Sequence, residues 1–214
     1  MKYPDVLAIT ETWLKSDEND YFNIEGYEAY HVNREEDGHA GGVALYVAKH
    51  IHSQEVLRIV KWNSVLTVQC RLLSVKLNIT VAYNPKEANT PPFLYDFEKA
   101  LKECQGKSLI LGDFNLNLLK PANNTLDYNL ILGSYGYDIV NKTLPLRLKS
   151  LTLLDHVTRN FNEGVSVYNI CSDTTDHNLL ICHVDIRSNC KKLSSGTVVS
   201  DNYDSINDYM ANNP

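Results

Sequence analysis

The sequence lacks the cysteine patterns, the long apolar runs and the excess of positive charge that would point to several common protein classes. Its five cysteines are scattered along 214 residues without a CxxC pair, so neither a disulfide framework nor a zinc site is predicted. No apolar run approaches the length of a membrane span, and the first residues, "MKYPDVLAIT", do not have the pattern of a signal peptide. We therefore expect an intracellular protein, in the nucleus or the cytoplasm, with no membrane partner.

The formal net charge of −6 does not favour nucleic-acid binding, because contacts with phosphate dominate that affinity. The charge argues against a broad basic groove but does not exclude a local one. Positive side chains gather loosely in one part of the chain, at Lys142, Arg147, Lys149 and Arg159. Loose clusters of this kind more often form a solvated face than a binding site. Within it we take Arg147 as the candidate contact to a substrate.

Length and composition predict one folded domain followed by a polar tail. A balance of 43% hydrophobic and 21% charged residues is typical of a folded soluble protein. The 214 residues are enough for one sizeable core and too few for two ordinary domains. From about Arg187 onward the sequence is rich in Ser, Asn, Asp and Lys. We expect the domain to span residues 1–186, and residues 187–214 to form a linker or a disordered tail.

Apolar periodicity predicts an α/β unit made mostly of strands. The clearest pattern covers residues 75–83, where apolar and polar residues alternate, which predicts a half-buried strand with Tyr83 at its core-facing end. Residues 66–72 alternate in the same way, so these two strands are expected to pair antiparallel. A helix is predicted from Pro91 to Cys104. The other predicted strands cover residues 5–10, 41–47, 109–111, 151–157, 165–170 and 179–184.

The stretch "LILGDFNLN" ends a predicted strand with a glycine and a pair of polar residues. Because side chains alternate along extended chain, Asp113 and Asn115 are expected to point to one side and Phe114 to the other. A carboxylate and a carboxamide held together at the end of a strand can hold a hydrated cation or orient a water molecule. The same residues are also compatible with an ordinary Asx turn followed by a cap.

Other residues with useful chemistry also fall at predicted strand ends. They are Glu11, Tyr83, Asp176 and His177, and Asp155 and His156 fall within the stretch "LTLLDHV". Strand ends and adjoining loops are where a rigid scaffold positions a site. Oxygen ligands, a positioned base and a His or Tyr donor are what a phosphate-ester hydrolase requires. Each residue alone also has an ordinary structural explanation, such as a first helical turn, a surface pair or a core tyrosine, and it is their conjunction that favours a site.

Six motifs in order carry a resemblance to a known family. They are "ITETWL", "GGVALYV", "VAYNP", "LILGDFNLN", "LTLLDHV" and "TDHNLLI". Together they resemble the endonuclease/exonuclease/phosphatase superfamily, and within it the apurinic-endonuclease-like domain of non-LTR (LINE-type) retrotransposons. The resemblance runs from about Asp5 to Val184. It implies a four-layer α/β sandwich, in which two mixed sheets pack face to face with helices outside.

The resemblance also implies an activity and partners. The expected reaction is Mg²⁺-dependent hydrolysis of a phosphodiester, with Mn²⁺ as a substitute, that nicks double-stranded DNA at a target site and primes a fused or neighbouring reverse transcriptase. Glu11 would be the main metal ligand, with Asp176 near the metal. Asp113 would orient or deprotonate the attacking water.

The remaining roles implied by the resemblance concern the substrate. Asn115 would hold Asp113 and a phosphate oxygen. His177 would lie against the scissile phosphate, oriented by Asp155 in a pair that favours the charged ring. Tyr83 would donate a hydrogen bond to the phosphate. This arrangement would place donors and a cation on one side of a charged transition state and a water molecule in line on the other.

The chain also departs from the family pattern. Relatives begin with a further strand that ends in an Asn beside the metal-binding Glu, and the residues upstream of Pro4 are too few to supply it. We expect a missing first strand to leave unpaired ladder groups and to make the chain weakly active or inactive. Two alternatives stay open: a smaller phosphate ester as substrate, as in relatives that cleave inositol phosphates, sphingomyelin or poly(A), and a non-catalytic remnant that binds nucleic acid.

Overall fold

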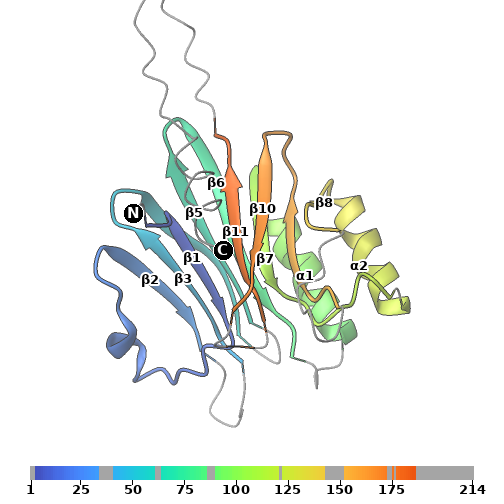
Figure 1. Cartoon of the computed structure of the whole chain (residues 1–214), viewed down its shortest axis with the longest axis horizontal. Coiled ribbons are helices and arrows are strands. Elements are labelled where there is room, and N and C mark those ends of the chain that lie inside the picture. Colours follow the sequence, from blue (N-terminus) through green and yellow to red (C-terminus); the bar gives the residue numbers. More distant parts are fainter. Residues whose placement is uncertain are drawn as a thin grey trace, which may run out of the picture.

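The computed structural model describes residues 3–33, 41–60, 64–85, 90–120, 122–142, 152–172, 175 and 177–186. These residues form two layers of strands, with two helices against one outer face (Figure 1). The elements along the chain are β1 (Val6–Thr10), the 3₁₀-helix η1 (Asn19–Phe22), β2 (Tyr27–Val32), β3 (Val43–Ala48), β4 (His52–Val60), β5 (Ser64–Leu72), β6 (Val75–Tyr83), α1 (Thr90–Glu103), β7 (Lys107–Asp113), α2 (Asn123–Ser134), β8 (Asp138–Ile139), β9 (Asp155–Arg159), β10 (Val165–Ile170) and β11 (Leu179–Val184).

One layer is a mixed six-stranded sheet in the order β4-β5-β6-β7-β9-β8. Strands β4, β5 and β6 follow one another as antiparallel neighbours, which confirms the predicted pairing of residues 66–72 with 75–83. The chain then crosses through α1 and returns as β7, parallel to β6, as a helical crossover requires. Strand β9 pairs antiparallel with β7. This register brings the ends of β6, β7 and the beginning of β9 to the same edge of the sheet.

The other layer consists of the sheet β1-β3-β2 and the hairpin β10-β11. An apolar core fills the space between the two layers, with buried side chains from both, among them Leu45, Val68, Val81, Leu109 and Val157. Two packed layers of strands with helices outside confirm the α/β sandwich that the family resemblance implied.

The two α-helices pack on the outer face of the six-stranded sheet. A second apolar cluster lies between them and the sheet and is rich in aromatic rings, including Phe93, Phe97, Phe114 and Tyr128. Phe114 contacts both helices, because its ring centroid lies 5.4 Å from that of Phe97 and 5.1 Å from that of Tyr128. No helix in the described part of the chain is long and apolar enough to cross a membrane.

Strand β6 differs from its prediction as a half-buried strand. From Leu77 to Tyr83 every residue is buried, because helices cover the face opposite the main core. The polar residues of this strand are satisfied within the protein. The hydroxyl oxygens of Thr80 and Thr67 lie 2.8 Å apart, and Asn78 donates to the carbonyl of Gln105. Apart from the exposed Lys76, the polar positions of this alternating pattern are therefore buried groups with partners.

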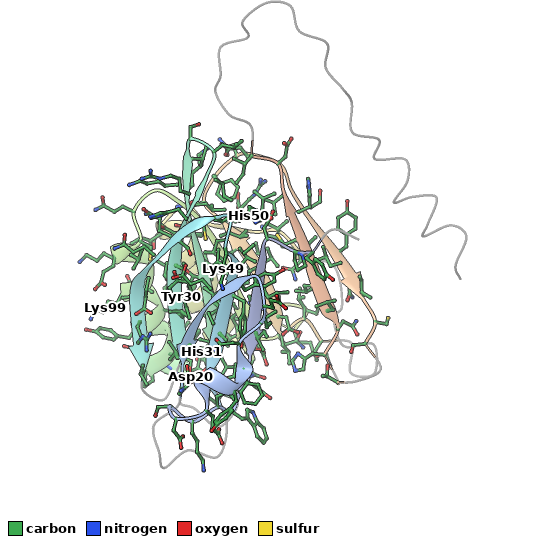
Figure 2. The ribbon with its side chains drawn as sticks, turned by 90° about the vertical axis from the view of Figure 1, so that its left-hand side faces the viewer. Asp20, Tyr30, His31, Lys49, His50 and Lys99 are labelled. Carbon is green, nitrogen blue, oxygen red and sulfur yellow. The ribbon has the colours of Figure 1, made fainter. Side chains whose placement is uncertain are left out.

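A polar contact ties β2 to β4 across the two layers. The hydroxyl of Tyr30 lies 3.0 Å from that of Ser53, which donates to the carboxylate of Glu28. Figure 2 shows Tyr30 and His31 in succession on β2. The next ring, His31, stacks edge-on against Tyr46 at a centroid distance of 5.5 Å. The small sheet is thus fixed to the large one at its outer edge as well as through the core.

Within the described residues, β1 pairs with β3 alone and β11 pairs with β10 alone. Figure 1 places β1 and β11 as the two edges that face each other in this layer. Each edge carries a half-exposed apolar side chain, Ile9 at 40% and Ile181 at 45%. The expectation that a first core strand is missing stays a prediction, and the predicted tail 187–214 lies outside the described residues.

Candidate functional site

Gly112 allows the strand that carries Asp113 to lie against its neighbour. In the parallel register of β6 and β7, Gly112 faces Ala82 and Asp113 faces Tyr83. A Cβ atom at Gly112 would lie 1.9 Å from the carbonyl oxygen of Ala82, a distance that no side chain tolerates. The glycine of "LILGDFN" is therefore required by close backbone approach, and it places Asp113 beside Tyr83 at the end of the sheet.

Asp113 and Asn115 face the same region, while Phe114 is buried on the other side among the aromatic rings. Asp113 is only 2% exposed. Its Oδ1 accepts the backbone N–H of Asn115 at 3.0 Å, and its Oδ2 lies 3.4 Å from the amide nitrogen of Asn115. Asn115 has a φ of 50°, in the left-handed region that asparagine tolerates better than most residues. This turn directs both polar side chains away from the core.

His177 reaches Asp113 and Asp155 from a different part of the chain. Asp155 begins β9 directly opposite Asp113 in the antiparallel register. The Nδ1 atom of His177 lies 2.9 Å and 3.1 Å from the two carboxylate oxygens of Asp155, and its Nε2 lies 3.8 Å from Oδ2 of Asp113. The ring is therefore held on one side by Asp155 and directs its other nitrogen toward the space beside Asp113.

Glu11 joins the same region through Tyr83. The hydroxyl of Tyr83 donates to Oε1 of Glu11 at 2.6 Å, and Tyr83 is itself the register neighbour of Asp113. Glu11 follows β1 and is exposed, with a φ of 54° that turns the chain away from the strand direction. This hydrogen bond connects the end of β1 in the small sheet to the end of β6 in the six-stranded sheet.

The residues present suit a hard divalent cation. Asp113, Asp155 and His177 each offer one ligand atom, and these atoms all lie within 4.8 Å of one another. The carboxylate of Glu11 adds another oxygen close to Tyr83. Carboxylate oxygens are the ligands that Mg²⁺ and Mn²⁺ prefer, usually one or two together with water and phosphate.

The structure thus brings together six of the predicted residues: Glu11, Tyr83, Asp113, Asn115, Asp155 and His177. The other two candidates, Asp176 and Arg147, lie outside the described residues. Both amide hydrogens of Asn115 point into the protein, toward Asp113 and the carbonyl of Asn84. Its contact with a phosphate oxygen stays a prediction.

Asn84 is a positioning residue that the sequence did not reveal. It is 2% exposed and follows Tyr83 at the end of β6. Its backbone N–H donates to the carbonyl of Asp113 at 3.0 Å, its side-chain amide donates to the carbonyl of Phe114 at 2.8 Å, and its own carbonyl accepts from the side chain of Asn115 at 2.7 Å. One residue therefore holds three consecutive positions of the loop that carries the acid.

Replacing Asn84 by alanine should loosen this loop. The carbonyl of Phe114 would be left buried without its donor, at a cost of about 1–2 kcal/mol in stability, and Asp113 would lose part of its orientation. If the reaction is the phosphodiester hydrolysis that the resemblance of the sequence implies, we expect its kcat to fall about tenfold with little change in KM. The matched control is Asn23→Ala, which removes a similar amide-to-carbonyl bond in an exposed loop. An equal effect of both variants would contradict the positioning role.

His156 lies beneath the site, and no role was predicted for it from the sequence. Its ring is fully buried and stacks on Phe114 at 4.9 Å with an interplanar angle of 9°. The Nε2 atom lies 3.0 Å from the carbonyl oxygen of Leu116 and 3.2 Å from that of Leu153. Because carbonyls only accept, Nε2 carries the proton, and Nδ1 accepts the hydroxyl of Tyr128 at 3.2 Å. Burial lowers the pKa of His156 from 6.5 to about 4.

Comparison with known proteins places the fold in a family. The sequence pattern of the Endonuclease/Exonuclease/phosphatase family matches residues 2–177. The solved endonuclease domain of TRAS1, a telomere-specific non-LTR retrotransposon, is 15% identical, with a TM-score of 0.67 over 84% of this chain and 85% of that chain. The AP endonuclease LMAP from Leishmania major is 14% identical, with a TM-score of 0.62 over 83% of this chain and 77% of that chain.

A third solved structure, D. rerio TDP2 complexed with a single-strand DNA product, is 14% identical, with a TM-score of 0.56 over 86% of both chains. A comparison with curated proteins found no match.

Proposed function

The chain belongs to the endonuclease/exonuclease/phosphatase family, and from this premise we propose that it is a Mg²⁺-dependent phosphodiester hydrolase that nicks DNA. The observation that carries the proposal is the position of His177, between Asp155 at 2.9 Å and Asp113 at 3.8 Å. A buried acid, a histidine held by a second acid and an adjoining tyrosine form a set suited to attack of water on a phosphodiester.

In the proposed reaction Asp113 orients the attacking water and accepts its proton. The hydrogen bonds that it accepts from Asn115 hold its carboxylate in one orientation. Asp155 accepts the hydrogen bond of Nδ1 and stabilises the protonated ring of His177, whose Nε2–H then donates to a phosphoryl oxygen. We propose Tyr83 as a second donor, which requires that its one hydroxyl hydrogen turn from Glu11 to the phosphate when the substrate binds. The Nε2–H of the protonated His177 ring meets the developing negative charge without rearrangement, which is how such sites lower a barrier.

Glu11 and Asp176 are the residues that we propose to hold the Mg²⁺ ion. We do not assign the ion to the other acidic group, because Asp155 and His177 already bond each other and Asp113 is assigned to the attacking water. When bound, the ion supplies positive charge that polarises the phosphate and offsets the charge of the leaving oxygen. Glu11 is positioned for this by its hydrogen bond with Tyr83, which in turn lies beside Asp113. We propose Arg147 as an additional contact to the substrate.

Similarity in fold to the TRAS1 endonuclease domain and to TDP2 complexed with DNA supports DNA as the substrate. We propose that the nick serves a retrotransposon, with a fused or neighbouring reverse transcriptase as partner. The net charge of −6 favours a second candidate, a smaller phosphate ester, because such a substrate makes fewer contacts that depend on positive charge.

Removing the metal should stop the reaction. We expect the purified chain to convert supercoiled plasmid to open circles in Mg²⁺, to lose this activity in EDTA and to recover it when Mg²⁺ is restored in excess. The nicking activity must co-elute with the chain on size exclusion, which separates it from a contaminating nuclease. Hydrolysis of small phosphate esters without nicking would favour the second candidate, and DNA binding without any Mg²⁺-dependent cleavage would indicate a non-catalytic protein.

A further inference from the structure

We propose that Trp13 is a stacking platform for a nucleobase next to the scissile phosphate, so that the substrate presents an unpaired base at this position. The inference rests on the proposed function, because it names the form of nucleic acid that the same site accepts. It is carried by the backbone at residues 11–13, by the exposure of the indole and by the charge around it.

The backbone at Glu11 and Trp13 has an unusual conformation. Their φ values are 54° and 56°, in the left-handed region. Bulky residues rarely adopt this region, and such outliers persist only where the surroundings hold them in place. Two of them in three residues show that the chain is turned here at a cost in conformational energy.

The two glycines that precede β3 supply the contacts that hold this turn. The backbone N–H of Thr12 donates to the carbonyl of Gly42 at 3.3 Å, and that of Trp13 donates to the carbonyl of Gly41 at 2.9 Å. A Cβ atom at Gly42 would lie 2.5 Å from the hydroxyl of Thr12, so the glycine is needed for this approach. Thr12 is thereby directed inward, and the indole on the next residue is left outside.

The indole of Trp13 is 63% exposed and stacks on no other ring among the described residues. It therefore adds little to the packing of the fold, although tryptophan has the largest apolar surface of any side chain. Two residues earlier, Glu11 is hydrogen-bonded to Tyr83 inside the site. Because adjacent Cα atoms are about 3.8 Å apart, Trp13 begins within about 8 Å of the residue proposed to bind the metal.

The charge of the chain makes stacking the more suitable source of affinity. The net charge is −6, and the segment that follows Trp13 carries Asp17, Glu18 and Asp20 against the single positive charge of Lys15. These carboxylates would repel phosphates, so a nucleic acid cannot be held here mainly through its backbone. A base stacked on an aromatic ring gains affinity without positive charge and without regard to sequence. Such a base must be free of its partner strand, which points to a locally unpaired substrate.

The first test compares two substrates in three variants. The readout is the ratio of kcat/KM for an oligonucleotide with an unpaired stretch to kcat/KM for bis(p-nitrophenyl) phosphate, a phosphodiester without a base. We expect this ratio to fall about 10- to 100-fold in Trp13→Ala, as the loss of one stacked base predicts, and to recover in Trp13→Phe. The control is Tyr3→Ala, an aromatic that is 81% exposed at the opposite end of β1.

The second test measures binding without catalysis. The chain has two tryptophans, so Trp62→Phe leaves Trp13 as the sole indole. Titration with the ten-nucleotide oligomer of thymidylate should quench its fluorescence, and an equal concentration of inorganic phosphate should not.

The outcomes distinguish the two proposals. Hydrolysis of neither substrate by the unaltered chain would contradict the proposed function. Normal hydrolysis with an unchanged ratio in Trp13→Ala, or an indole that the oligomer does not quench, would overturn the stacking role.

Discussion

Replacing Asp113 by asparagine is expected to lower the rate of the proposed DNA nicking by about 10³-fold. Asp113 is 2% exposed and ends β7 at the point where the strands of both layers bring their polar residues together. The asparagine has nearly the same shape, so it removes the negative charge and the proton-accepting capacity while leaving the packing. The loss should fall on kcat rather than KM, because the proton is transferred only in the transition state.

The hydrogen bonds around Asp113 explain why an amide cannot replace it. Its Oδ1 accepts the backbone N–H of Asn115, and its Oδ2 faces both the amide of Asn115 and Nε2 of His177. Every one of these neighbours is a donor or becomes one when His177 is protonated. An asparagine would place an NH₂ group against at least one of them, and it could not take the proton of a water molecule.

The measurement is the initial rate of plasmid relaxation in Mg²⁺, with thermal melting to verify that the variant is folded. The matched control is Asp127→Asn, which removes the same charge from an exposed position on α2 and should leave the rate unchanged. A loss of less than about tenfold in Asp113→Asn would show that another group accepts the proton, and Asp155 would be the next to replace.

Much of the fold could be predicted because most of its strands have one apolar face. The spans of β10 and β11 coincide with the predicted 165–170 and 179–184. Edge strand β4 was not predicted, because its pattern is partly polar. Gln54 and Arg58 are exposed, and Arg58 forms an ion pair with Glu55 of the same strand. Helix α2 was missed because its apolar residues do not lie on one face: Leu126 and Leu130 are exposed, while Tyr128 is buried.

The strand predicted at 151–157 shows how the site alters a local pattern. In the structure β9 begins only at Asp155. Leu153 and Leu154 precede it and are buried outside the strand, where their carbonyls accept the backbone N–H groups of Leu118 and Phe114. Their apolar character reflects packing against the loop that follows Asp113. In the sequence, apolar residues buried in this way give the same pattern as residues of a buried strand.

The site itself was predictable as a set of residue types at strand ends, but its supports were not. Asn84 and His156 act through contacts with backbone carbonyls, which depend on a register between elements far apart in sequence. No spacing along the chain encodes such contacts. In "LTLLDHV" the histidine looks like a polar residue beside an acid, yet it is fully buried and Asp155 is the residue that faces His177.

Acid should destabilise the protein through His156 by about 3 kcal/mol between pH 6.5 and pH 4. Burial lowers the pKa of this ring from its ordinary value of 6.5 to about 4. Above pH 6.5 the ring is neutral in both folded and unfolded chains and contributes no pH dependence. Below pH 6.5 His156 is protonated in the unfolded chain but stays neutral in the folded chain. Stability is therefore lost as the pH falls, until the pH reaches the pKa of His156 in the folded chain.

The test is urea unfolding of the wild type and of His156→Gln from pH 7 to pH 4. Glutamine cannot titrate, so the two stability curves should converge as the pH falls, with the wild type losing about 3 kcal/mol more than the variant. Carboxylates titrate in both proteins and cancel in the difference. The variant will be less stable at pH 7, because a glutamine cannot bond both carbonyls and the hydroxyl of Tyr128. His52→Gln, on the exposed face of β4, is the control and should leave the curve unchanged.

Parallel curves for the wild type and His156→Gln would show that His156 does not oppose protonation. Converging curves would carry a consequence for the reaction, since the carbonyls that His156 binds lie on either side of the site. Leu116 follows Asn115, and Leu153 lies two residues before Asp155. Protonation of the His156 ring would put a positive charge beneath these two carbonyls. The neighbouring site residues Asn115 and Asp155 would then lose their fixed positions. Nicking should therefore decline in acid along with stability, and His156→Gln should lessen that part of the decline.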